Sequence, residues 1–187
     1  GLSVALCDQL EAVPSQGNLI KRDITRVLTP GTIIEEGMLQ ARKNNWLAAV
    51  VLEESKGSQP NNWGLAIADV STGEFLLSQR SDMSALKQEL LKLNASEILW
   101  GENNCNTTKL WCPDPKKLSI ISNNPFSYPE AELVIKRAFK LNTINGLGLQ
   151  DWPLAIRAAG GLLAYLQETK PRKLDEQGLN NSITLDQ

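Results

Sequence analysis

The stretch Trp46-Leu-Ala-Ala-Val-Val-Leu52 (WLAAVVL) decides the fold class of this chain. It is almost continuously apolar, whereas a strand with one face in water alternates apolar and polar residues. The stretch therefore predicts a strand that is buried on both faces. The segments on either side show what covers it.

A hairpin and a helix follow this strand. Gly64 to Val70 (GLAIADV) and Glu74 to Ser78 (EFLLS) are separated by Ser-Thr-Gly, which predicts a β-hairpin. Asp82 to Asn94 predicts a helix, with Asp82 as its N-cap and Asn94 as its C-terminal stop. The apolar residues of this helix recur every three or four positions, at Met83, Leu86, Leu90 and Leu93.

Two further strands and two helices are predicted beyond Asn94. The strands are Glu97 to Trp100 and Leu118 to Ile121, with a polar loop between them. Ser127 and Glu130 have capping-box spacing and open a helix through about Leu141. Asp151 is expected to cap the last helix, which has Pro153 in its first turn and carries Gly160-Gly161 in its middle. Each mid-helix glycine costs about 1 kcal/mol relative to alanine, which predicts close backbone packing there rather than a ligand site.

This order of elements predicts an α/β fold, with a mixed sheet and helices on its faces. The ribonuclease-H-like architecture has this pattern. Upstream, Leu2 to Leu6 and Leu19 to Leu28 read as strands, and Thr29-Pro-Gly-Thr32 has turn chemistry. From Lys170 the chain turns polar, and we expect that tail to fray.

The composition is that of an ordinary globular chain of one or two domains. Its 187 residues are 42% hydrophobic and 21% charged, and the formal net charge is -2. An avid, autonomous nucleic-acid binder would usually be basic. Any contact of this chain with DNA is therefore expected to be local and weak, or shared with other regions.

Three cysteines and no histidine limit the metal chemistry available. Cys7, Cys105 and Cys112 contain no C-x-x-C pair, so an ordinary zinc site lacks its ligands. We expect free thiols in a reducing cytoplasm, with a Cys105–Cys112 loop disulfide as the alternative. No apolar run approaches the roughly 20 residues of a membrane span, and no signal peptide opens the chain. Gly1 in place of Met fits a fragment or a processed chain.

Carboxylates are the catalytic candidates that stand out, since a Ser-Lys arrangement is open to this chain but no pattern of residues marks one. Without histidine the commonest general base is missing, and no G-x-x-x-x-G-K-[ST] loop offers an ATP site. Two-metal nucleases need several acids that converge on two cations, and the candidates are Glu53, Glu54, Asp69 and Glu74. The first strand carries no acid, and Asp69 precedes a turn that it can cap. A structural role is favoured, with a small metal-dependent nuclease as the alternative.

Lys21, Arg22 and Arg26 form the only basic cluster in a strand-like setting. Side chains of this kind can contact phosphate. Asp23 lies among them and dilutes the positive field, so the residues alone favour a solvated strand face.

Several segments, in order and correctly spaced, resemble the MutS family of DNA mismatch repair proteins. Val4 to Gln9 (VALCDQ) resembles VAICDQ, and Leu19 to Thr32 (LIKRDITRVLTPGT) resembles LVKREVTRVLTPGT. Asn44 to Val50 (NNWLAAV) resembles NN[YF]LAAV. Gly64 to Phe75 resembles GLAxxDxSTGEF, and Leu185 to Gln187 looks like the start of LDxxTRRNLE.

The resemblance implies a domain organisation. Residues 1–30 would be the C-terminal remnant of an α/β mismatch-recognition domain, and residues 31–44 a linker. Residues 45–169 would be the ribonuclease-H-like connector domain, and residues 170–187 a tail toward the core domain. The mismatch-contacting Phe-x-Glu motif would lie upstream of Gly1, and the Walker motifs beyond Gln187.

The resemblance also implies a function for this part of the family protein. The connector would couple mismatched-DNA binding to the ATPase core and help to dock a MutL-type partner, without catalysis of its own. ATP and Mg²⁺ would belong to the intact protein, so no cofactor is expected in this chain. Its partners would be the remaining MutS domains, a MutL-type protein and, weakly, duplex DNA, with no membrane. Arg22 and the adjacent Lys21 would be the phosphate contacts.

Overall fold

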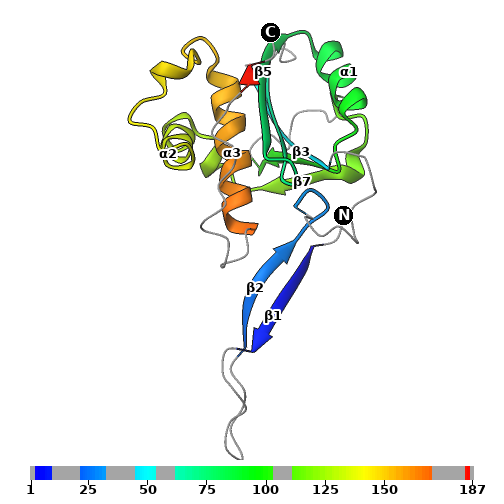
Figure 1. The fold of residues 1–187 in the computed structure, drawn as a ribbon. Coiled ribbons are helices and arrows are strands. Elements are labelled where there is room, and N and C mark those ends of the chain that lie inside the picture. The colour runs from blue at the N-terminus through cyan, green and yellow to red at the C-terminus, as the bar shows by residue number, and fades with distance from the viewer. Residues whose placement is uncertain are drawn as a thin grey trace, which may run out of the picture.

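The computed structural model has two parts, a β-hairpin and an α/β domain (Figure 1). The hairpin extends away from the domain, and the short turn that follows its second strand lies against the domain. The structure describes residues 3–9, 22–32, 45–53, 62–102, 111–169 and 184–185.

The domain is built on a six-stranded mixed sheet with the order β7-β6-β3-β4-β5-β8. β3, β4 and β5 pair antiparallel, whereas β3 with β6, β6 with β7 and β5 with β8 pair in parallel. The predicted mixed α/β sheet and its hairpin are therefore confirmed. The strands are β3 (Trp46–Leu52), β4 (Asn62–Asp69), β5 (Glu74–Ser81), β6 (Glu97–Gly101), β7 (Leu118–Ile121) and β8 (Thr184–Leu185).

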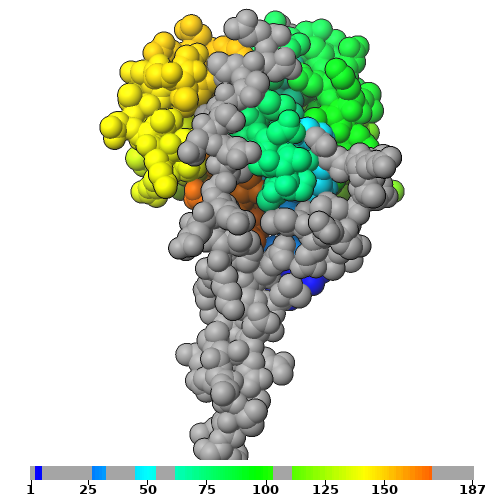
Figure 2. Space-filling model, in the orientation of Figure 1, coloured from blue at the N-terminus to red at the C-terminus, as the bar shows by residue number. Residues whose placement is uncertain are grey.

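Helices cover both faces of the sheet. α1 (Met83–Leu93) lies on one face, and α2 (Tyr128–Ala138) and α3 (Pro153–Thr169) lie on the other (Figure 1). In the space-filling view α1 and α2 accordingly occupy opposite sides of the molecule (Figure 2). No helix in the described ranges is long and apolar enough to cross a lipid bilayer.

The apolar strand β3 contributes to both cores. Leu47, Ala49 and Val51 pack in the cluster under α2 and α3. Their neighbours in the strand pack in the cluster under α1. Every residue from Leu47 to Leu52 is buried, which confirms the predicted strand with two buried faces.

α1 has the predicted ends. The Asp82 carboxylate accepts a hydrogen bond of 2.8 Å from the Ser84 backbone N–H, as an N-cap does. Hydrogen bonds from the Ser84 side chain and backbone lower the pKa of the Asp82 carboxyl below its ordinary value. Asn94 stops the helix in the left-handed conformation with φ 49°.

The ends of α2 and α3 differ from the prediction. Ser127 occupies the N-cap position of α2, but its side chain makes no capping hydrogen bond, and the helix ends at Ala138 rather than Leu141. The prediction that Asp151 caps α3 is wrong. The Gln79 side chain of β5 accepts hydrogen bonds from the Leu154 and Ala155 backbone N–H groups at 2.7 and 3.1 Å.

Close packing explains the two glycines in the middle of α3. A Cβ atom on Gly160 would lie 2.3 Å from the Cβ atom of Ala131 in α2, and one on Gly161 would lie 2.2 Å from the Phe126 ring. Both distances are far below van der Waals contact. The expected close approach of backbones is confirmed, and it sets how tightly α3 packs on α2.

The hairpin preceding the domain pairs β1 (Val4–Gln9) antiparallel with β2 (Arg22–Leu28). Both predicted strands therefore exist: β1 continues to Gln9, beyond the expected Leu6, and β2 ends at Leu28 as expected. Of the predicted linker 31–44, residues 33–44 lie outside the described residues, and Gly31 and Thr32 belong to the turn that follows β2. Most of the tail also lies outside the described residues, but Thr184–Leu185 pairs with β5, so this part of the tail adds a strand to the sheet.

Candidate functional site

The described hairpin connects to the α/β domain through the predicted turn at residues 29–32. The turn is closed by a backbone hydrogen bond of 3.1 Å from Thr32 N–H to Thr29 O. Thr29 N–H also donates to the Thr32 hydroxyl at 3.0 Å, and the two threonine hydroxyls lie 2.9 Å apart. Thr29, Gly31 and Thr32 are buried. The turn is therefore held in one conformation and packed into the domain surface.

The Glu97 carboxylate is the main acceptor for this turn. Its Oε2 atom accepts a hydrogen bond of 3.1 Å from the Gly31 backbone N–H. Its Oε1 atom accepts from the Ser119 hydroxyl at 2.7 Å and from the Tyr165 hydroxyl at 2.8 Å. Glu97 begins β6 and is only 3% exposed. An ionised carboxylate is an acceptor only, so three donors suit this buried group.

Asn45 holds the neighbouring peptide of the turn. Its side-chain amide donates to Pro30 O at 2.9 Å, and its Oδ1 atom accepts from the Ser96 hydroxyl at 2.5 Å. Ser96 directly precedes Glu97. The Glu97 carboxylate, which accepts from the turn, and the Asn45 amide, which donates to it, are therefore both held at the start of β6. We call Asn45, Glu97 and Tyr165 the turn-binding residues, whereas Ser119 contacts the Glu97 carboxylate and not the turn.

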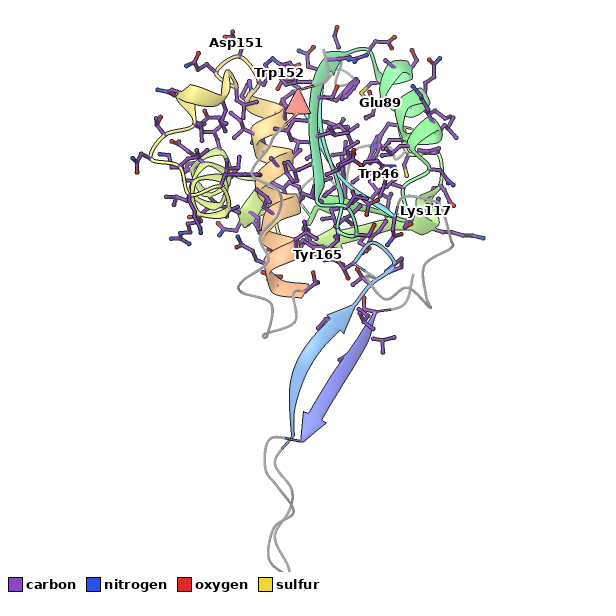
Figure 3. All side chains as sticks on the ribbon, viewed as in Figure 1. Trp46, Glu89, Lys117, Asp151, Trp152 and Tyr165 are labelled. Carbon is purple, nitrogen blue, oxygen red and sulfur yellow. The ribbon has the colours of Figure 1, made fainter. Side chains whose placement is uncertain are left out.

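Tyr165 connects this network to α3. Burial is the main cause that raises the pKa of its phenol well above the ordinary value, and the nearby Glu97 charge raises it further. A hydrogen bond with the Thr29 side chain acts in the opposite direction. The phenol therefore stays protonated and can donate at neutral pH. Tyr165 lies toward the end of α3 that is nearest the hairpin (Figure 3).

The turn also packs closely against Leu47 of β3. A Cβ atom on Gly31 would lie 2.6 Å from Cδ1 and 3.1 Å from Cβ of Leu47, and 3.2 Å from Oε2 of Glu97. Leu47 is fully buried. A side chain at position 31 would thus displace either the core or the carboxylate. Glycine is required here by proximity.

The carboxylates considered for a metal site have separate roles in the structure. Asp69 is buried, and its oxygens accept from the Ser71 N–H and hydroxyl at 2.8 and 2.6 Å and from the Asn45 N–H at 3.2 Å. It is a turn-capping residue at the end of β4, as interpreted. Glu74 is exposed beside Thr72.

Glu53 is also exposed, and it accepts a hydrogen bond of 2.8 Å from the Asn62 side chain. Glu54 lies outside the described residues. Within the described ranges, no three His, Cys, Asp or Glu side chains are grouped so that they could hold a metal ion. The described acids therefore do not converge on one point.

The side chains predicted to contact phosphate lie outside the part of the chain that the structure describes. Lys21 lies outside the described residues, and Arg22 is described only as the first backbone position of β2. Cys105 is likewise outside them, while Cys112 is buried in the cluster under α1. The nucleic-acid assignment therefore remains a prediction.

Sequence reasoning identified the turn but none of the turn-binding residues. The signal for Glu97 was present, since a carboxylate at the first position of a buried strand (EILW) needs partners. Nothing in the sequence marks which donors it meets, because Gly31 and Tyr165 are 66 and 68 residues away.

These features define a class of protein, an α/β domain that holds the end of a preceding segment in a fixed position through buried hydrogen bonds. Comparison with known families then identifies the family. The family model described as MutS domain II matches residues 45–176, and the model described as MutS domain I matches residues 1–37. The chain belongs to the MutS family.

Similar curated proteins include DNA mismatch repair proteins MutS from Synechococcus and Prochlorococcus. The protein from Synechococcus sp. (strain CC9311) is 56% identical over 183 residues, which cover 96% of this chain and 20% of the relative. The protein from Prochlorococcus marinus (strain MIT 9303) is 57% identical over 172 residues, which cover 91% of this chain and 19% of the relative. The chain thus spans about a fifth of the length of these relatives.

Proposed function

We propose that this chain acts in DNA mismatch repair as a coupling region. It would hold the end of a mismatch-recognition domain on a connector domain and take no catalytic step itself. The observation that carries the proposal is the Gly31–Glu97 hydrogen bond. It joins a residue in the MutS domain I match to a residue in the MutS domain II match.

The proposal includes the division of the chain expected from the sequence. Residues 45–169 would be a ribonuclease-H-like connector, a reading supported by the mixed sheet with helices on both faces. Residues 1–30 would end the recognition domain, 31–44 would link the two, and 170–187 would lead to the core domain. The pairing of Thr184–Leu185 with β5 is compatible with such a path.

The absence of a catalytic step is supported by how the described carboxylates are used. Asp69, the best placed acid, already accepts three hydrogen bonds from neighbouring groups. A carboxylate used as a metal ligand needs free lone pairs directed at the ion. Glu53 and Glu74 are exposed and bond to their own neighbours, Asn62 and Thr72.

A cleavage assay separates the coupling region from a small nuclease. The purified chain, incubated with duplex DNA, single-stranded DNA and RNA in Mg²⁺ or Mn²⁺, is expected to cut none of them. The matched variants are Asp69→Asn and Glu74→Gln, each checked by circular dichroism for a retained fold. Metal-dependent cleavage by the wild-type chain that disappears in either folded variant would overturn the proposal.

The partner part of the proposal has its own test. A MutL-type protein from the same organism, titrated into isotope-labelled chain, is expected to shift amide resonances within 45–169. ATP with Mg²⁺ should shift none, because the nucleotide site is assigned to another region of the intact protein. Unchanged spectra with the MutL-type protein would contradict docking through this domain.

A further inference from the structure

We infer that Glu97 is a positioning residue whose carboxylate sets the orientation of the β1–β2 hairpin relative to the α/β domain. The inference deepens the proposed coupling function and rests on it for its biological meaning. The structural basis is the unequal use of the two carboxylate oxygens. One oxygen binds elements of the domain, and the other binds the turn that leads from the hairpin.

The domain side of this arrangement is rigid. Glu97 pairs with Leu47 of β3 in the parallel β3–β6 ladder, and both β3 and β6 lie inside the sheet. Ser119 comes from β7 and Tyr165 from α3, so the hydroxyls that hold Oε1 belong to two separate elements. These two hydrogen bonds hold the carboxylate from the domain side. Oε2 therefore presents its lone pairs in a fixed direction.

On the turn, the group that bonds to Oε2 of Glu97 is a backbone N–H, that of Gly31. A Gly31 N–H has no side-chain freedom, so a hydrogen bond to it constrains the peptide plane itself. The adjacent Pro30 carbonyl is bound by Asn45, which fixes the same turn at a second point. Because β2 ends at Leu28, directly before the turn, the orientation of these peptides determines where the hairpin points.

The chemistry predicts which substitutions preserve the effect. In Glu97→Gln the amide oxygen can face Gly31 N–H, and the amide NH2 can donate to the Ser119 and Tyr165 hydroxyls, which can also act as acceptors. This variant should keep the hairpin orientation. Glu97→Met keeps a similar length and removes every acceptor, so it should release the hairpin while filling the space.

The test measures orientation and local opening in the full chain. Residual dipolar couplings of the β1–β2 amides should fit the alignment tensor of the α/β domain in the wild-type and Glu97→Gln chains, but not in Glu97→Met. Amide exchange at Gly31 should become about tenfold faster or more in Glu97→Met, as expected when a bond to a charged acceptor is lost. Ser119→Ala is the matched control, since it removes one donor to the same carboxylate and leaves the turn contact.

Three results would overturn the inference. They are hairpin couplings in Glu97→Met that still fit the domain tensor, Gly31 exchange that stays at the wild-type rate, or equal effects from Ser119→Ala and Glu97→Met. If Glu97→Met does not fold, the double variant Ser119→Ala with Tyr165→Phe replaces it. That variant leaves the carboxylate and removes both hydroxyls that orient it, together with the Tyr165–Thr29 hydrogen bond. Gly31 exchange is therefore expected to be faster than in Tyr165→Phe alone. An unchanged rate there would also overturn the inference.

The test of the Glu97 inference can fail independently of the test of the proposed function. These measurements use the chain without DNA, nucleotide or partner. A hairpin released by Glu97→Met in a chain that cleaves DNA would leave the inference standing and remove the coupling proposal. If the hairpin is unaffected by Glu97→Met and the chain has no nuclease activity, the inference falls and the coupling proposal stands.

Discussion

The backbone N–H of Gly31 donates a 3.1 Å hydrogen bond to Oε2 of Glu97, a residue 66 positions further along the chain. Both groups are buried. Hydrogen bonds to charged groups contribute about 1.5–3 kcal/mol, and a buried N–H left without an acceptor costs a similar amount. This one contact therefore links the hairpin segment to the sheet with an energy that is large beside the stability of a small domain.

Substitution of Gly31 should destabilise the chain. In Gly31→Ala the added methyl group meets buried Leu47 and the Glu97 carboxylate at 2.6 and 3.2 Å, so we expect a loss of about 1–3 kcal/mol from overpacking. The control is Gly146→Ala, where a Cβ atom meets nothing within 4 Å. Urea unfolding should leave the control within about 0.5 kcal/mol of wild type. Equal stability of both variants would show that the turn is not tightly packed.

Gly160→Ala tests the packing of α3 on α2 through the sign of its effect. Helix propensity alone predicts a gain of about 1 kcal/mol. The structure predicts a loss of about 1–3 kcal/mol, because the new methyl group would lie 2.3 Å from the Cβ atom and 2.4 Å from the Cα atom of Ala131. Exposed Gln167→Ala on the same helix serves as the control. A stabilised Gly160→Ala chain in urea unfolding would mean that the helices are further apart.

Tyr165 gives stability a dependence on alkaline pH. Its folded-state pKa is raised, chiefly by burial, while the unfolded chain releases this proton near the ordinary value of about 10. Above that pH the unfolded state binds fewer protons than the folded state, so stability falls as the pH rises. Tyr165→Phe should be less sensitive to alkaline pH.

The titration can be followed directly. The chain has two tyrosines, so Tyr128→Phe leaves Tyr165 as the only phenol. In that variant phenolate absorbance should stay flat through about pH 10 and appear only when the chain unfolds. A smooth rise centred at about pH 10, with the fold intact, would place the Tyr165 phenol in water.

Binding to DNA should be weak and blind to mismatches. We expect a Kd no tighter than about 10⁻⁴–10⁻⁶ M at physiological salt, with a salt slope of roughly -2 to -3 for two or three phosphate contacts. Lys21→Ala with Arg22→Ala should flatten that slope and weaken binding to all duplexes alike, because phosphate contacts carry no sequence information. In competition binding, a preference above about tenfold for a G·T mismatch over a matched duplex would contradict this.

Local signals in the sequence predicted most elements of the fold. The WLAAVVL run lies in β3 with the same bounds, and Asp82 and Asn94 end α1 as expected. These features depend on residues within a few positions of one another. The capping of α3 could not be found in this way, because its acceptor, Gln79, comes from a strand about 75 residues earlier.

The sequence predicted the turn of the candidate site but not the residues that bind it. Thr29-Pro-Gly-Thr32 was identified as a turn from its own residues. Its acceptor Glu97 lies on β6 and is itself held by hydroxyls from β7 and α3, which the sequence did not indicate. For Asp69, in contrast, the sequence did predict the role that the structure shows. Its position before a turn indicated a backbone-capping role, and the hydrogen bonds with Ser71 have that local form. Long-range polar partners require the fold, and local ones do not.

The most direct test of the account is whether the hairpin and the α/β domain move as one body. ¹⁵N relaxation of the full chain in solution reports the rotational diffusion of each part. The Gly31–Glu97 and Pro30–Asn45 hydrogen bonds predict that amides of β1 and β2 share one diffusion tensor with those of β3 to β6. A distinctly shorter correlation time for the hairpin, with the domain tumbling by itself, would contradict a coupling role for this chain.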